Sequence, residues 1–106
     1  MGDNDRLGRL EEIVLLALVC LGGDAYGVPI RREIAERTGR DVSFGAVYTT
    51  LDRLEGKGYV KSRVGEPTPE RGGRAKRYFR IEAAGSRALN EARQAIASMG
   101  GLVRAG

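Results

Sequence analysis

A very short connection between two helical patterns constrains the fold of this chain more than any other feature. Ile30 and Ile34 mark the inward face of one pattern, which closes at Thr38-Gly39, and the next pattern begins at Ser43. Only a few residues, including a glycine, are left to join the two helices. Helices joined in this way are held at a steep angle to one another, so the sequence predicts a helix-turn-helix arrangement.

The segment from Ser43 to Val60 predicts a short helix with two different faces. The apolar face carries three residues at helical spacing, which are Val47, Leu51 and Leu54. The opposite face is small, hydroxylated and basic, and consists of Ala46, Thr49, Thr50, Arg53 and Lys57. Such a face suits a helix that must fit between two walls of phosphate, so this segment is a candidate recognition helix.

The start of this helix is well specified. Ser43 is placed to cap the free amides of the first turn, while Val42 and Val47 have the spacing of a hydrophobic staple. Gly45 within that turn costs about 0.5–1 kcal/mol relative to alanine. A close approach to another backbone or to phosphate would compensate for this cost.

A strongly apolar helix is predicted before the helix-turn-helix. Its stripe contains Leu7, Leu10, Val14, Ala17, Leu18 and Leu21, and is widened by Ile13, Leu15, Leu16 and Val19. A helix that is apolar on most sides must be covered on most sides, and we expect part of the cover to come from a second subunit. Cys20 lies within this pattern and is expected to be a small buried core residue. Glu11 and Glu12 are expected on the surface of the helix.

After the recognition helix, two segments with alternating apolar and polar residues predict a β-hairpin. They are Tyr59 to Gly65 and Lys76 to Glu82, and the residues between them read E-P-T-P-E-R-G-G-R-A. Two prolines and two glycines exclude regular structure there, so we expect an extended loop at the tip. A hairpin added to a helix-turn-helix makes a winged helix, and the predicted fold class is mainly α with a small β-hairpin.

The last segment has the apolar spacing of a helix that packs against another helix. Its residues Leu89, Ala92, Ile96, Met99 and Val103 recur at alternating steps of three and four. We interpret it as a dimerisation helix at 83–99, following a winged-helix part at 7–82 in a single domain, with loose tails at 1–6 and 100–106. The predicted dimer interface comprises Leu10, Val14, Leu15, Leu18, Leu89, Ala92, Ile96 and Met99.

Positive charge is concentrated in the hairpin. The formal net charge is +4, yet the segment from Lys61 to Arg80 holds seven Lys/Arg and two Glu, a balance of +5, and the remainder sums to −1. A local field of this kind either attracts a polyanion or keeps a loop solvated, and composition does not separate the two.

Composition argues against enzymatic chemistry. The chain has no histidine and one cysteine, and no carboxylate pair is set in an evident cleft. Hydrolytic triads and His/Cys metal sites are therefore not expected, and we predict no catalytic residue, no metal and no cofactor. The start M-G-D-N-D-R lacks the pattern of a signal peptide, and no apolar run has membrane-spanning length, so a soluble cytoplasmic protein is expected.

Four segments give the chain a resemblance to a known family. They are A-Y-G-V-P-I at 25–30, S-F-G-A-V-Y-T-T-L at 43–51, L-E-G-K-G-Y-V at 54–60 and G-G-R-A-K-R-Y-F-R-I at 72–81. In this order and spacing, the chain resembles the PadR family of bacterial transcriptional regulators in its short form, a winged-helix domain with one C-terminal helix. It departs at Thr49, where the family commonly has proline, and at Glu82, where a threonine usually caps the last helix.

The resemblance implies a homodimeric repressor that binds double-stranded DNA. Its third helix would enter the major groove, its wing would contact the backbone or minor groove, and its first and last helices would form the dimer. By analogy with relatives, a small hydrophobic effector at the dimer interface is left open. An alternative is a winged-helix module for protein or RNA contact, which would not need a basic, hydroxyl-bearing third helix.

The candidate DNA-binding residues combine the helix face with the wing. They are Ser43, Gly45, Tyr48, Thr49, Thr50, Arg53, Arg71, Arg74 and Lys76. For Tyr48, the alternative is that the ring lies against the hairpin as the rim of the core. Arg77 and Arg80 are alternatively expected to pair with Glu residues on neighbouring elements.

Overall fold

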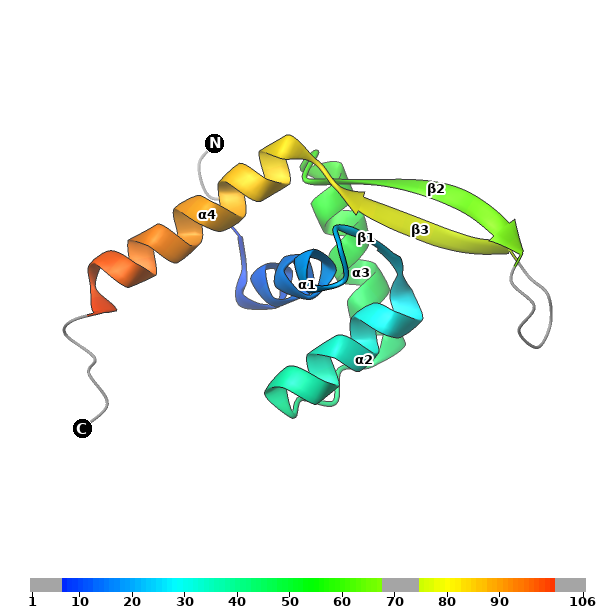
Figure 1. Cartoon of the computed structure of the whole chain (residues 1–106), viewed down its shortest axis with the longest axis horizontal. Coiled ribbons are helices and arrows are strands. Elements are labelled where there is room, and N and C mark those ends of the chain that lie inside the picture. The colour runs from blue at the N-terminus through cyan, green and yellow to red at the C-terminus, as the bar shows by residue number, and fades with distance from the viewer. Residues whose placement is uncertain (1–6, 68–74, 101–106) are drawn as a thin grey trace.

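The computed structural model describes residues 7–67 and 75–100, which form four helices and a three-stranded antiparallel sheet (Figure 1). The elements are α1 (Arg9–Cys20), β1 (Asp24–Tyr26), α2 (Gly27–Thr38), α3 (Phe44–Gly56), β2 (Val60–Pro67), β3 (Ala75–Ile81) and α4 (Ala83–Ser98). The predicted winged helix-turn-helix with an additional C-terminal helix is confirmed.

The core is built around α1, which packs against α2, α3 and α4. Its largest fully buried side chains include Leu15, Leu18, Ile30, Ile34, Leu51, Leu54 and Phe79. Each comes from an apolar position of its helix or strand, so burying these side chains together is what holds the elements around α1.

Four residues predicted for the dimer interface lie in this core instead. Val14, Leu15 and Leu18 are completely buried within one chain, and Leu89 is 4% exposed. The prediction is corrected for these residues, because α2, α3 and the sheet already cover that side of α1, and Leu89 of α4 belongs to the same core. Cys20 was expected in the core and is exposed, because it stands in the last turn of α1.

The sheet has one strand that the sequence pattern did not predict. β1 is only three residues long, pairs with β3 and places Tyr26 opposite Tyr78. Gly22 and Gly23 take positive φ angles of 91° and 88°, which turn the chain from α1 into this strand. The resulting strand order is β1-β3-β2, so β3 lies in the middle.

α4 begins close to the hairpin and then leaves the body of the molecule (Figure 1). Gly85 is required where α4 passes the hairpin, because a Cβ there would collide with the carbonyl oxygen of Tyr59. Glu82 is the N-cap residue and makes no side-chain capping hydrogen bond, as its departure from threonine predicted. The far half of α4 is exposed, including Ile96 and Met99. None of the helices in the described part of the chain is long and apolar enough to cross a membrane.

Candidate nucleic-acid interface

The N-terminal end of α3 has the capping structure that its sequence predicts. The Ser43 Oγ accepts a hydrogen bond from the amide of Ala46 at 3.0 Å. Val42 and Val47 are both buried in the core, as expected for a hydrophobic staple. The helix therefore starts at a position fixed by local chemistry.

The turn between α2 and α3 is held by Arg31. Its Nε donates to the carbonyl oxygen of Val42 at 2.6 Å, and its Nη2 lies 3.0 Å from Asp41 Oδ1. The same guanidinium stacks over the ring of Phe44, 4.6 Å from the ring centre. Arg31 thus connects α2, the turn and the first residue of α3, a role that the sequence did not reveal.

The outward face of α3 carries small and basic side chains. Gly45, Thr49 and Arg53 are exposed and follow one another at intervals of four residues. A Cβ at Gly45 would contact only the Ser43 Oγ, at 3.9 Å. No close approach within the described chain explains this glycine, so its clearance is available to an external surface.

Thr50 does not belong to this face. It is 3% exposed, and its hydroxyl donates to the Ala46 carbonyl at 2.7 Å. The assignment of Thr50 to the outward face was wrong because it lies three residues after Val47 and four before Leu54, on the buried side of the helix.

Tyr48 lies against the rest of the domain. Its ring packs near Phe79 of β3, with ring centres 6.3 Å apart. Its hydroxyl end fills the space beside Gly27, where any Cβ would collide with it. The alternative placement of Tyr48, at the rim of the core, is the one observed.

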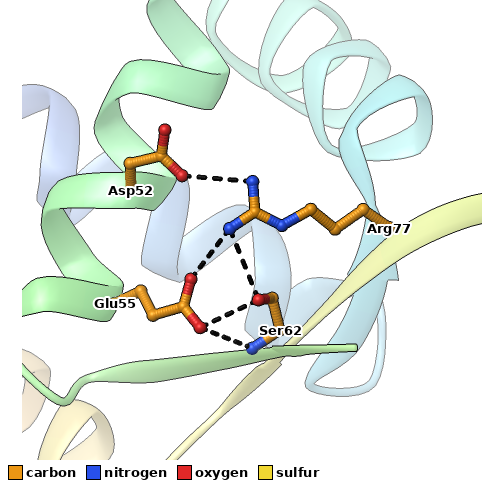
Figure 2. A network of polar contacts seen from close by, with 4 residues as sticks. All are labelled: Asp52, Glu55, Ser62 and Arg77. Atoms are coloured by element: carbon orange, nitrogen blue, oxygen red, sulfur yellow. Dashed lines mark hydrogen bonds and ion pairs between the residues drawn. The ribbon is translucent and has the colours of Figure 1, made fainter. Parts of the chain in front are cut away.

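A polar network fixes α3 against the hairpin (Figure 2). Arg77 of β3 bridges Asp52 at 3.3 Å and Glu55 at 2.9 Å on consecutive turns of α3. Glu55 Oε2 also accepts hydrogen bonds from the amide and the hydroxyl of Ser62 on β2, at 3.1 and 2.8 Å. The hydrogen bond from the Ser62 hydroxyl is the largest cause that lowers the pKa of Glu55 below its ordinary value.

The C-terminal end of α3 is also tied to α1. Lys57 Nζ lies 2.8 Å from Glu11 Oε1, which also accepts a hydrogen bond from the Gly8 amide at 2.7 Å. Glu11 is 7% exposed, so its expected position on the surface was wrong. The ion pair makes its burial possible, since a carboxylate is rarely buried without a partner.

Several basic residues of the hairpin are already paired within the chain. Arg63 binds Asp24 at 3.0 Å, and Arg80 binds Glu82 at 3.3 Å. The expected pairing of Arg77 and Arg80 with acidic residues is confirmed. Lys76 stacks over the Tyr26 ring at 5.5 Å. Arg71 and Arg74 lie outside the described residues.

The model of the transcriptional regulator PadR-like family matches residues 15–91 of the sequence. The chain belongs to this family. As a PadR-like protein it is a DNA-binding transcription regulator, and both the family and the fold are those of regulators and not of enzymes. No curated protein sequence matches it significantly.

Solved structures agree with the PadR-like assignment. A transcriptional regulator from Clostridium thermocellum, Cth-833, is 26% identical, with a TM-score of 0.72 over 89% of this chain and 85% of that one. A PadR family regulator from Clostridium difficile is 22% identical, with a TM-score of 0.67 over 88% and 98%. F93 from STIV, a winged-helix DNA-binding protein, is 21% identical, with a TM-score of 0.66 over 84% and 89%.

Within this PadR-like chain, the structure brings together the α3 residues Ser43, Gly45, Thr49 and Arg53 and removes Thr50 from them. Phe44 was missed, although it is exposed beside them. Its spacing from Val47 and Leu51 continues the apolar stripe, which favours burial from sequence. In the structure the Phe44 ring lies under the Arg31 guanidinium and remains 42% exposed.

Proposed function

We propose that this PadR-like protein is a repressor that binds a near-palindromic operator as a homodimer. The observation that supports DNA reading best is the outward face of α3, on which Gly45, Thr49 and Arg53 are exposed. The helix is held by Arg31 just before its first turn, and by Glu11 and Arg77 near its last turn. A winged helix places such a helix in the major groove, where its N-terminal residues contact base edges. Small side chains allow close approach, and Arg53 supplies positive charge.

The wing is proposed to contact the flanking backbone or minor groove. Three basic residues are assigned to this contact, namely Arg71, Arg74 and Lys76. The guanidinium groups of Arg63, Arg77 and Arg80 pair with Asp24, with Asp52 and Glu55, and with Glu82, so a phosphate would have to compete with these carboxylates. The proposed contacts are thus fewer than the net charge of the segment suggests.

The dimer is proposed to form through the exposed apolar residues of α1 and α4. Ile96 is 64% exposed, Met99 59% and Val19 47%. Leu10 and Ala92 are half-buried and complete this surface. Beside it, a cavity of about 240 Å³ opens between α1 and α2, with Ile13, Leu16, Cys20 and Ile34 among its lining. Apolar side chains exposed on a projecting helix favour cover by a second copy.

Selection of bound DNA from a random pool at physiological salt tests this function. A dimer with two α3 helices should enrich two symmetric half-sites about one helical turn apart. Failure to enrich any duplex motif, or stronger retention of RNA, would contradict it and favour the alternative of a protein- or RNA-binding module.

The salt dependence of binding to the selected duplex tests the role of Arg53. Arg53→Ala should reduce the slope of log affinity against log salt by about one unit if Arg53 neutralises a phosphate. The matched control is Arg87→Ala on α4, which is exposed and remote from α3 along the chain. Equal slopes for Arg53→Ala and the unaltered protein would remove Arg53 from the interface.

A further inference from the structure

Phe44 is a large apolar side chain at the tip of the proposed recognition helix. It is the first residue of α3 and is 42% exposed. Side chains in a helix are tilted toward its N-terminus, so a residue in the first turn projects past the helix end. The Phe44 ring therefore stands where a recognition helix meets the bases.

The ring is held in place from within the chain. The Arg31 guanidinium lies 4.6 Å from the ring centre. Arg31 is fixed in turn by its bond to the Val42 carbonyl at 2.6 Å and by Asp41 at 3.0 Å. Phe44 is thus preorganised, and little side-chain freedom remains to be lost when it meets a ligand.

Phe44 is the one bulky exposed side chain among its neighbours in the first turn of α3. Gly45 has no side chain, and the Ser43 hydroxyl accepts a hydrogen bond from the Ala46 amide. A phenyl ring cannot exchange hydrogen bonds with base edges as an amide or a guanidinium does. In the major groove, the apolar feature that distinguishes one base from the others is the 5-methyl group of thymine.

We propose that Phe44 reads the 5-methyl group of one thymine in each half-site, and that Arg31 is its positioning residue. This inference rests on the proposed function, because it requires α3 to lie in the major groove. It adds a large aromatic contact at the N-terminal tip of α3, where the face described above has only small and basic side chains.

A purely structural role for Phe44 makes a different prediction. If the ring only covered Arg31 and the turn, its removal would lower the melting temperature and weaken binding to every duplex equally. It would not alter the difference between thymine and uracil, which differ only in the methyl group.

The test uses a duplex recovered by random-pool selection with the unaltered protein, in which each thymine is replaced in turn by deoxyuridine. We expect one position per half-site to lose about fourfold in affinity, the size expected for burial of one methyl group. Phe44→Ala should bind the thymine and uracil duplexes with equal affinity. Arg31→Lys, which keeps the charge but not the planar stack, should reduce the methyl effect.

The outcomes separate this inference from the proposed function. If selection yields no duplex, the proposed function fails. If a symmetric duplex is recovered but no uracil substitution weakens binding, or the loss is the same in Phe44→Ala, Phe44 does not read thymine while DNA binding stands. If Phe44→Ala folds poorly, a uracil series on the unaltered protein that shows no loss still overturns the inference. If a loss is seen, Arg31→Lys tests whether it depends on the held Phe44 ring.

Discussion

At the scale of single residues, the first turn of α3 combines a stabilising cap with a destabilising glycine. Ser43 caps the helix through the Ala46 amide, while Gly45 two residues later is exposed, and a Cβ there would make only an ordinary contact with the Ser43 Oγ at 3.9 Å. Glycine in a helix costs stability because the unfolded chain loses more freedom on folding. Nothing in the described fold requires this glycine, so the requirement is assigned to the DNA surface.

Gly45→Ala should therefore separate stability from binding. We expect the free energy of unfolding to rise by about 0.5–1 kcal/mol, as for glycine-to-alanine changes at unstrained sites. Affinity for the selected duplex should fall, because the added methyl group stands between α3 and the groove. Denaturant unfolding and a binding titration measure the two effects.

The matched control is Gly27→Ala. Its Cβ would collide with the Tyr48 ring, so this variant should lose stability. A Gly45→Ala variant that binds DNA as tightly as the unaltered protein would mean that Gly45 does not face the duplex.

At the scale of elements, the orientation of α3 relative to the hairpin depends on the polar network of Figure 2. Glu55 is its centre, since it receives hydrogen bonds from Ser62 on β2 and from Arg77 on β3. Because these donors lower the pKa of Glu55, the carboxylate is ionised more readily in the folded protein than in the unfolded chain. The joint between α3 and the hairpin is consequently sensitive to acid.

The sign of the effect follows from linkage. A group with a depressed pKa contributes stability that is fully present above its unfolded pKa and is lost as pH falls through its folded pKa. The ordinary value for Glu55 is 4.5, so the loss should occur below this pH. In Glu55→Gln, the free energy of unfolding should be lower at neutral pH and should approach that of the unaltered protein as the pH falls below this value.

Urea unfolding between neutral pH and pH 3 measures this difference. Ser62→Ala tests the largest cause directly, because it removes the hydroxyl donor and should raise the pKa of Glu55 toward its ordinary value in an NMR titration. Stability curves for Glu55→Gln and the unaltered protein that stay parallel through the acid range would contradict the linkage.

At the scale of the whole molecule, α4 is the element that carries exposed apolar side chains away from the domain. Its first turns pack on the hairpin and α1, and its far half extends away from the domain (Figure 1). Ile96 and Met99 are exposed there, and Val19 of α1 is an exposed apolar residue as well. In the proposed dimer, these residues provide the shared apolar surface.

Ile96→Glu should convert the dimer to a monomer, because a carboxylate would be buried without a partner in the interface. Sedimentation velocity over a range of protein concentrations measures this change. The control is Val64→Glu on β2, which is 76% exposed and outside the proposed interface, and which should remain dimeric. An Ile96→Glu variant that sediments as the unaltered protein does would exclude this helix from the interface.

The sequence by itself determined the features that depend on neighbouring residues. The start of α3 at Ser43 and the two strands of the hairpin are local signals, and both are found where they were predicted. The family motifs likewise identified the winged helix, because their order and spacing reflect the order of its elements.

Only the tertiary structure decided which side of each element faces inward. α1 is apolar on most sides, so periodicity could not separate the buried Leu15 and Leu18 from the exposed Val19. Glu11 became buried because its partner Lys57 lies on α3, and β1 formed because β3 offered it an edge. Burial depends on contacts between segments distant along the chain, and these contacts are absent from any local pattern.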